Sequence, residues 1–169
     1  MGTQDRPDLE RRLESHAPAS LLAIGRRAAE LLAPFLNAHP DCRVEYLDSA
    51  GDLDAQTLLE QLAKQPRFDF VVVRGVLERF DAQHGAHLLA CLRDVHSSHF
   101  CVALEASDER QTWPPAELIA MGLSQWPAER AGDAELDIYG FELGSYKATP
   151  DWLNARHWAH PEHWGKFRW

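Results

Sequence analysis

The stretch FDFVVV at residues 68–73 constrains the fold more than any other part of the chain. It is β-branched and apolar on both alternating faces, which suits a central parallel strand covered by helices on both sides. Further strand signals lie at residues 21–24, 43–48 and 100–104, and helical patterns separate them. Four strands that alternate with three helices predict a doubly wound α/β domain with a mainly parallel sheet.

The three helical patterns differ in how clearly they begin and end. The first starts at Ala28 with apolar residues at helical spacing, and we expect Pro34 inside it to kink or shorten the helix. Asp52 is the expected N-cap of the second helix. The third helix is predicted from apolar residues three and four apart, which are Leu88, Cys91, Leu92 and Val95.

The regular alternation of strand and helix patterns ends after residue 106. A short helix is expected after Pro114 and Pro115, followed by two strands at 123–130 and 136–146 that form an antiparallel hairpin at one edge of the sheet. Pro127 makes the first of these the weaker strand. The predicted organisation is therefore a polar N-terminal extension (1–19) with one short helix, an α/β domain (20–146) and a Trp-rich tail (147–169).

Composition narrows the function classes. The chain has 169 residues and a formal net charge of −9, the reverse of the basic balance typical of nucleic-acid binders. It has no apolar run long enough to cross a membrane, and its first residues lack the apolar core of a signal peptide. Three cysteines without a CxxC pair favour reduced, buried thiols. We expect a cytoplasmic protein without nucleic-acid or membrane partners.

Residues 68–81, FDFVVVRGVLERFD, carry a family resemblance. They resemble the fourth motif of class I S-adenosylmethionine-dependent methyltransferases, a strand that runs into a V-L-E-H-like loop, with Arg79 at the place of the His. The order of strands, helices and hairpin over residues 20–146 is similar to the same Rossmann-like family. The resemblance implies that this compact, bacterial-type domain, if it is an enzyme, is a methyltransferase, with S-adenosylmethionine as its cofactor.

The crevice at the carboxyl ends of the strands is where open α/β sheets bind ligands. The resemblance implies that Asp48, at the end of the second strand, holds the ribose hydroxyls; an Asp before a Ser-Ala-Gly-Asp turn also occurs for purely local reasons. Glu78 is the candidate substrate-binding residue, and no catalytic residue is assigned. The candidate cofactor-binding residues are Gly25, Arg26, Asp48, Arg74 and Gly75.

Two features depart from the family pattern. Residues 21–29, LLAIGRRAA, keep one glycine of a G-x-G-x-G-like turn, place Ala23 at the acidic position and put two arginines in the turn. About twenty residues separate Asp48 from Phe68, where the family has an additional strand and helix. We therefore expect a degenerate, non-catalytic domain that needs no cofactor and acts in ligand sensing or protein interaction. The alternative is an active methyltransferase that binds S-adenosylmethionine in an atypical site.

Arg26 and Arg27 lie near a predicted helix N-terminus, where the helix dipole disfavours cations. They indicate either an acidic neighbour, such as Glu30 or Asp48, or a bound anion such as a nucleotide or phosphorylated metabolite.

The tail from residue 147 holds four of the six tryptophans, with four basic and two acidic residues. It is predicted to cover the domain's own apolar surface, or to dock on a protein partner or a second copy. His157, His160 and His163 are three residues apart, but their spacing matches no standard zinc pattern, so we predict exposed histidines and no metal.

Overall fold

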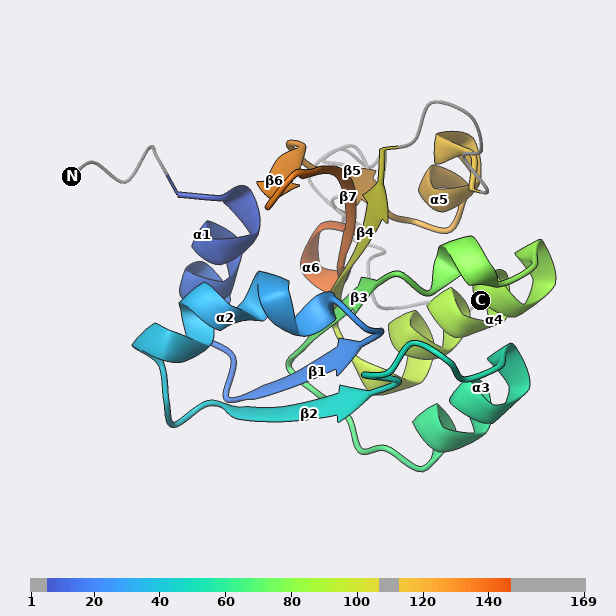
Figure 1. The fold of residues 1–169 in the computed structure, drawn as a ribbon, viewed down its shortest axis with the longest axis horizontal. Helices are drawn as coiled ribbons and strands as arrows, with labels where there is room; N and C mark the ends of the chain where they lie inside the picture. Colours follow the sequence, from blue (N-terminus) through green and yellow to red (C-terminus); the bar gives the residue numbers. More distant parts are fainter. Residues whose placement is uncertain (1–5, 107–112, 147–169) are drawn as a thin grey trace, which may run out of the picture.

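The computed structural model describes residues 6–106 and 113–146, and these form a three-layer α/β fold around one sheet (Figure 1). The strand order is β2-β1-β3-β4-β7-β5, and β6 pairs with β7. The first four strands are parallel, whereas β7 runs antiparallel to β4. The strands are β1 (Ser20–Ile24), β2 (Arg43–Leu47), β3 (Phe70–Arg74), β4 (His99–Glu105), β5 (Ser124–Gln125), β6 (Glu129–Ala131) and β7 (Ala134–Glu142). The predicted fold class is confirmed.

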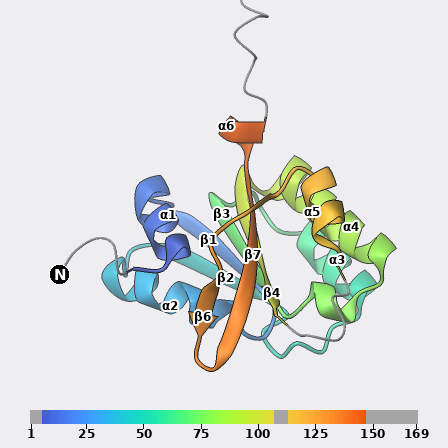
Figure 2. The same cartoon turned by 90° about the horizontal axis from the view of Figure 1, so that it is seen from above.

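Helices cover both faces of the sheet (Figure 2). On one side, α1 (Asp8–His16) and α2 (Ala28–Ala38) pack on the inner residues of β1, β3 and β7. On the other side lie α3 (Ala55–Ala63), α4 (Ala82–Cys91) and α5 (Pro115–Ala120). The remaining elements are the short turns η1 (Leu77–Arg79), η2 (Leu92–His96) and α6 (Leu143–Tyr146). All five residues of β3 are buried, as its apolar sequence predicts.

The predicted hairpin is present, with a turn at Gly132 and Asp133 between β6 and β7. Its first strand is broken in two, because Trp126, Pro127 and Ala128 separate β5 from β6. Pro127 has no backbone N–H for the ladder, which accounts for the break. The longer strand β7 lies inside the sheet, between β4 and β5.

Strand β2 lies at one end of the strand order and so forms one border of the sheet (Figure 1). A single helix, α3, connects β2 to β3. This agrees with the short chain between Asp48 and Phe68. The side chains of Arg43, Glu45 and Tyr46 on β2 are exposed, whereas those of the neighbouring β1 are almost all buried.

Three helix details bear on the predictions: Pro34 does not shorten the first helix, and the other two helices differ from what was expected. Helix α2 continues past Pro34 to Ala38, because Leu32 and Phe35 remain buried on one face and the missing N–H removes a single donor. The N-cap of α3 is Asp54 instead of Asp52, since the Asp54 carboxylate accepts a hydrogen bond from Thr57 N at 2.9 Å. After Cys91 the backbone becomes π-helical, and the wider turn exposes Val95.

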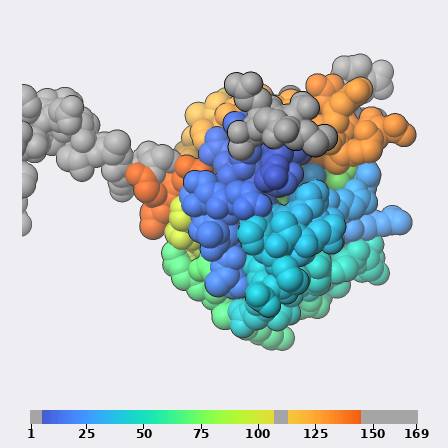
Figure 3. All heavy atoms as spheres, turned by 90° about the vertical axis from the view of Figure 1, so that its left-hand side faces the viewer, coloured from blue at the N-terminus to red at the C-terminus, as the bar shows by residue number. Residues whose placement is uncertain are grey.

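Helix α1 packs beside α2 (Figure 3) and is also held by residues near the C-terminal end of the described chain. Leu9 is buried in the core, and its backbone N–H donates to Glu129 Oε1 at 2.6 Å. Arg12 pairs with Glu142 at 2.8 Å and stacks over the ring of Trp126, 3.9 Å from its centroid. Residues that precede the first strand therefore form part of the same core as β6 and β7.

Candidate functional site

The residues predicted for the cofactor crevice do gather at one edge of the sheet, where the parallel strands end. Gly25 follows β1, and its backbone N–H donates to Leu47 O at 2.9 Å. Asp48 follows β2, and Gly75 follows Arg74 at the end of β3. These residues can bind a ligand only through polar groups that have no hydrogen-bond or ion-pair partner within the protein.

Gly25 sits where two chain segments touch. Its φ of +101° is a conformation that favours glycine, and a Cβ at this position would lie 1.9 Å from Arg74 O and 2.7 Å from Val76 Cγ2. The glycine thus lets the turn after β1 pack directly on the end of β3.

Arg26 connects the turns after β1 and β2. A Cβ on Gly51, which has a φ of +72°, would lie 2.8 Å from Arg26 Cβ. The stem of Arg26 therefore lies against the backbone of the β2–α3 loop. The Arg26 guanidinium is exposed and makes no ion pair with any residue in 6–106 or 113–146.

The carboxylate of Asp48 is fully buried and engaged within the protein. Its Oδ1 accepts hydrogen bonds from the backbone N–H groups of Asp52 and Leu53, both at 3.0 Å, and its Oδ2 pairs with Arg79. Asp48 itself has a φ of +55°. Its observed role is to fold the β2–α3 loop back on the end of β2.

Arg79 completes this arrangement from the loop after β3. Its Nε donates to Gly75 O and its Nη1 donates to Leu53 O, each at 3.0 Å, while Nη2 pairs with Asp48. One guanidinium thus joins the loops that follow β2 and β3. One feature of the sequence pointed to Arg79, namely its place at the position of a histidine in the related motif, but this feature did not identify its partners.

A second arginine, Arg74, is buried at the end of β3 with 1% of its side chain exposed. Its Nη1 lies 3.0 Å from Glu30 Oε2 and its Nη2 lies 3.4 Å from Glu105 Oε1. Arg27 binds the same two carboxylates, at 3.2 Å and 2.9 Å. For Arg27 the expected acidic neighbour is therefore Glu30, together with Glu105, whereas Arg26 has no such neighbour among the described residues.

This four-residue network has an electrostatic consequence. The pKa of the Glu30 carboxyl is lowered, because it accepts hydrogen bonds from Arg27 and lies beside the charge of Arg74. The Nε of Arg74 is buried and has no hydrogen-bond partner among the described residues. The network ties α2 to the ends of β3 and β4.

Glu78, the candidate substrate-binding residue, lies in η1 beside this network. Its Oε1 accepts a hydrogen bond from Glu105 N at 3.4 Å, whereas its Oε2 is buried without a partner among residues 6–106 and 113–146. Burial raises the pKa of the Glu78 carboxyl, and the nearby charge of Glu105 acts in the same direction. Its turn is fixed from the other side by Trp113, whose indole Nε1 donates to Leu77 O at 3.1 Å.

We expect Glu78→Gln to stabilise the protein at pH 7 by on the order of 1 kcal/mol, because the amide carries no charge to desolvate. A raised pKa means that the folded state binds the proton more tightly than the unfolded state. The wild-type therefore loses stability from this group as the pH rises through the raised pKa, and the variant does not.

Thermal unfolding at pH 4 and pH 7 measures this difference. The advantage of Glu78→Gln should shrink toward pH 4, where the wild-type carboxyl is increasingly protonated. Asp133→Asn, which removes one charge from the exposed β6–β7 turn, is the control and should show no comparable advantage at pH 7. Equal behaviour of the two variants would contradict the prediction.

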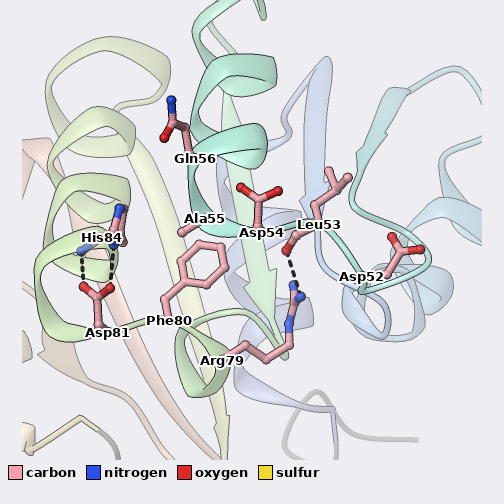
Figure 4. A pocket seen from close by; sticks show the side chains of 9 residues that line it. All are labelled: Asp52, Leu53, Asp54, Ala55, Gln56, Arg79, Phe80, Asp81 and His84. Atoms are coloured by element: carbon pink, nitrogen blue, oxygen red, sulfur yellow. Dashed lines mark hydrogen bonds and ion pairs between the residues drawn. The ribbon is translucent and has the colours of Figure 1, made fainter.

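A cavity of about 490 Å³ lies beside Arg79, between the start of α3 and the start of α4 (Figure 4). Phe80 and Arg79 contribute from the β3 side, and Asp52, Asp54 and Asp81 supply carboxylates. Asp54 and Asp81 cap the two helices, since each accepts a backbone N–H at 2.9 Å. Gly25, Arg26 and Asp48 are not among the residues that line this cavity.

The other sequence predictions have mixed outcomes. All three cysteines are free, and Cys101 is buried. Within 6–106 and 113–146, no group of three or more His, Cys, Asp or Glu side chains could hold a metal ion. In the same ranges no helix is long and apolar enough to span a membrane. The predicted tail contacts, with His157, His160 and His163, lie outside the described residues.

Several solved structures with a similar fold are methyltransferases. A putative O-methyltransferase from Nostoc punctiforme aligns with a TM-score of 0.52 at 13% identity, covering 79% of this chain and 54% of the other. Burkholderia thailandensis 1,6-didemethyltoxoflavin-N1-methyltransferase, with bound S-adenosylhomocysteine, gives 0.51 at 17% identity, covering 79% and 76%. Synechocystis magnesium protoporphyrin IX methyltransferase, with bound S-adenosylmethionine, gives 0.50 at 14% identity, covering 78% and 74%.

These alignments show that the chain has the class I methyltransferase-like fold, as the resemblance implied. The chain spans about half the length of several of the structures it matches, 50% to 54% of the first three. No curated protein matches the sequence. Residues 3–169 match a family described as "Family of unknown function (DUF6231)". The chain therefore belongs to the DUF6231 family.

Proposed function

We propose that this protein is a methyltransferase-like domain that does not transfer methyl groups and that acts in protein interaction or ligand sensing. The observation that carries the proposal is the state of Asp48. Both oxygens of its carboxylate are engaged within the protein, by two backbone N–H groups and by Arg79, and the side chain is 0% exposed. A carboxylate must have free lone pairs to accept the two hydroxyl groups of a ribose.

The neighbouring residues also fit S-adenosylmethionine poorly. The resemblance places the cofactor between the glycine turn after β1 and the acidic residue after β2. In this chain those two turns touch through Arg26 and Gly51, and Arg79 joins the second turn to the loop after β3. The chain also lacks the additional strand and helix that contribute adenine contacts in the family. The contacts between the turns support a crevice closed by the protein's own side chains, and the missing elements support the loss of adenine contacts.

The alternative of an anion held by Arg26 and Arg27 has weaker support. Arg27 is already paired with Glu30 and Glu105, so that of these two arginines Arg26 alone has a guanidinium with no ion pair to any residue the structure describes. A single exposed arginine is a weak anion site, because water and salt screen its charge.

Calorimetric titration of the full chain with S-adenosylmethionine and S-adenosylhomocysteine tests the proposal. We expect no saturable heat at ligand concentrations up to about 1 mM, and no rise in unfolding temperature. A ligand present at 100 times its dissociation constant would stabilise the fold by about 2.7 kcal/mol, so even modest binding would be detected.

Two variants make the result specific. Asp48→Asn alters the carboxylate at the crevice, whereas Asp69→Asn alters one that caps the backbone at the opposite edge, where it accepts N–H groups of Ala19 and Ser20 at 2.9 Å. Micromolar binding that Asp48→Asn abolishes and Asp69→Asn retains would overturn the proposal. It would support an active methyltransferase with its acceptor near Glu78.

A further inference from the structure

The border strand β2 has backbone groups that face away from the sheet. Arg43 N donates to Ala19 O at 3.0 Å, and Gly25 N donates to Leu47 O at 2.9 Å, so Arg43 and Leu47 point their backbone groups toward β1. Hydrogen bonding alternates along a parallel strand. The N–H and C=O groups of Val44 and Tyr46 therefore point outward, where no further strand from residues 6–106 or 113–146 lies.

The side chains along this edge differ in polarity between the two faces of the sheet. Arg43 and Glu45 share the face that carries α3, and both are exposed with no ion pair to any residue the structure describes. Val44 and Tyr46 share the opposite face, where Val44 is half-buried against the core and Tyr46 is 49% exposed. One face of the edge is thus charged, with both signs present, and the other is apolar.

We propose that β2 pairs with β2 of a second copy of this chain, antiparallel about a twofold axis at Val44. The two outward Val44 backbones then exchange a pair of hydrogen bonds. On one face, Arg43 of each copy lies opposite Glu45 of the other, which gives two cross-strand ion pairs. On the other face, Val44 meets its counterpart and Tyr46 lies opposite Cys42. The two sheets join into one continuous sheet across the axis.

Charge selects this register among those that match outward backbone groups. An axis at Glu45 would place the two Glu45 carboxylates directly opposite each other, and like charges in that position are destabilising. An axis at Tyr46 would pair Glu45 with Leu47 and leave Arg43 beyond the paired segment. Only the axis at Val44 gives both charged side chains a partner of opposite sign.

The size of the interface predicts how such a dimer behaves. A five-residue edge buries less than the roughly 1,600 Å² of a standard stable interface. We therefore expect a dimer whose population rises with protein concentration, measurable by sedimentation equilibrium of the full chain.

Charge reversal tests the register. Arg43→Glu and Glu45→Arg each replace two attractive pairs by two repulsive ones, and each should weaken dimerisation by roughly 30-fold. The double variant Arg43→Glu/Glu45→Arg restores opposite signs and should recover dimerisation to near the wild-type level. Because both positions are exposed on an edge strand, the unfolding temperature of all three variants should remain near that of the wild-type.

A backbone variant gives an independent readout. Val44→Pro removes an outward N–H that β1 does not use, so the monomer should keep its circular dichroism spectrum while dimerisation is lost. A wild-type protein that stays monomeric at millimolar concentration would overturn the proposal. So would a dimer that survives both single reversals, which would place self-association on another surface, such as the Trp-rich tail.

Discussion

Replacing Gly25 by alanine is expected to destabilise the domain by about 3–5 kcal/mol, the largest effect of any single methyl group added at the crevice. The new Cβ would lie 1.9 Å from Arg74 O, a backbone atom at the end of a fully buried strand. Neither the strand nor the turn can move without disturbing the ladder between β1 and β3. The φ of +101° adds strain for any residue with a side chain.

Gly75→Ala is the matched control for this variant. Gly75 also has a positive φ, of +69°, but a Cβ there meets nothing within 4 Å. It should therefore show only the conformational penalty, roughly 1–2 kcal/mol. Urea unfolding of the two variants separates close packing from backbone strain. Equal losses of stability would mean that the contact between the β1 turn and Arg74 O is not tight in solution.

Asp48→Ala is expected to destabilise the protein by about 3–4 kcal/mol, because it leaves two backbone N–H groups and the Arg79 guanidinium without their acceptor. Alanine also tolerates the φ of +55° poorly, whereas Asp and Asn adopt it more readily. The large loss would identify Asp48 as a structural anchor of the β2–α3 loop.

Asp48→Asn distinguishes the hydrogen bonds from the charge. The amide oxygen can still accept from Asp52 N and Leu53 N, but its NH2 group cannot accept from Arg79, so we expect a smaller loss of about 2 kcal/mol, from the hydrogen bond with Arg79. Chemical denaturation of both variants gives the comparison. If both variants were as stable as the wild-type, the loop would not depend on this carboxylate. The argument that Asp48 is unavailable to a ribose because it holds the loop would then fail.

Sequence periodicity was sufficient for the sheet but not for every helix. The apolar runs of β1, β3 and β4 identify their strands because each run is buried on both faces. The third helix shows where periodicity fails. A spacing of 3.6 residues places Val95 on the buried face with Leu88, yet the π-helical turn of η2 rotates Val95 into solvent and buries His96. Such a turn depends on tertiary packing that a single sequence does not display.

In the candidate site, too, some features could be predicted from the sequence and others depend on tertiary packing. The positions of Gly25, Asp48 and Arg74 at one sheet edge are predictable, because parallel strands end at the same edge. The partners of their side chains are not predictable. The Arg79–Asp48 pair spans 31 residues, and the contact of Arg74 with Glu30 spans 44. Which of several acids an arginine reaches depends on loop conformations that the sequence pattern leaves open.

The way helix α1 is held has a consequence for synthesis on the ribosome. Its anchor Glu129 lies 120 residues beyond Leu9, and its other partners, Trp126 and Glu142, belong to the same late segment. During translation α1 therefore emerges long before these late residues, which supply part of the surface that buries it. Until then Leu9 and Leu13 lack the part of their cover that comes from the late segment, and incompletely covered apolar surface is prone to aggregation. The core around α1 is thus complete only after β7 has left the ribosome. A nascent chain arrested before residue 126 should therefore be a substrate for chaperones.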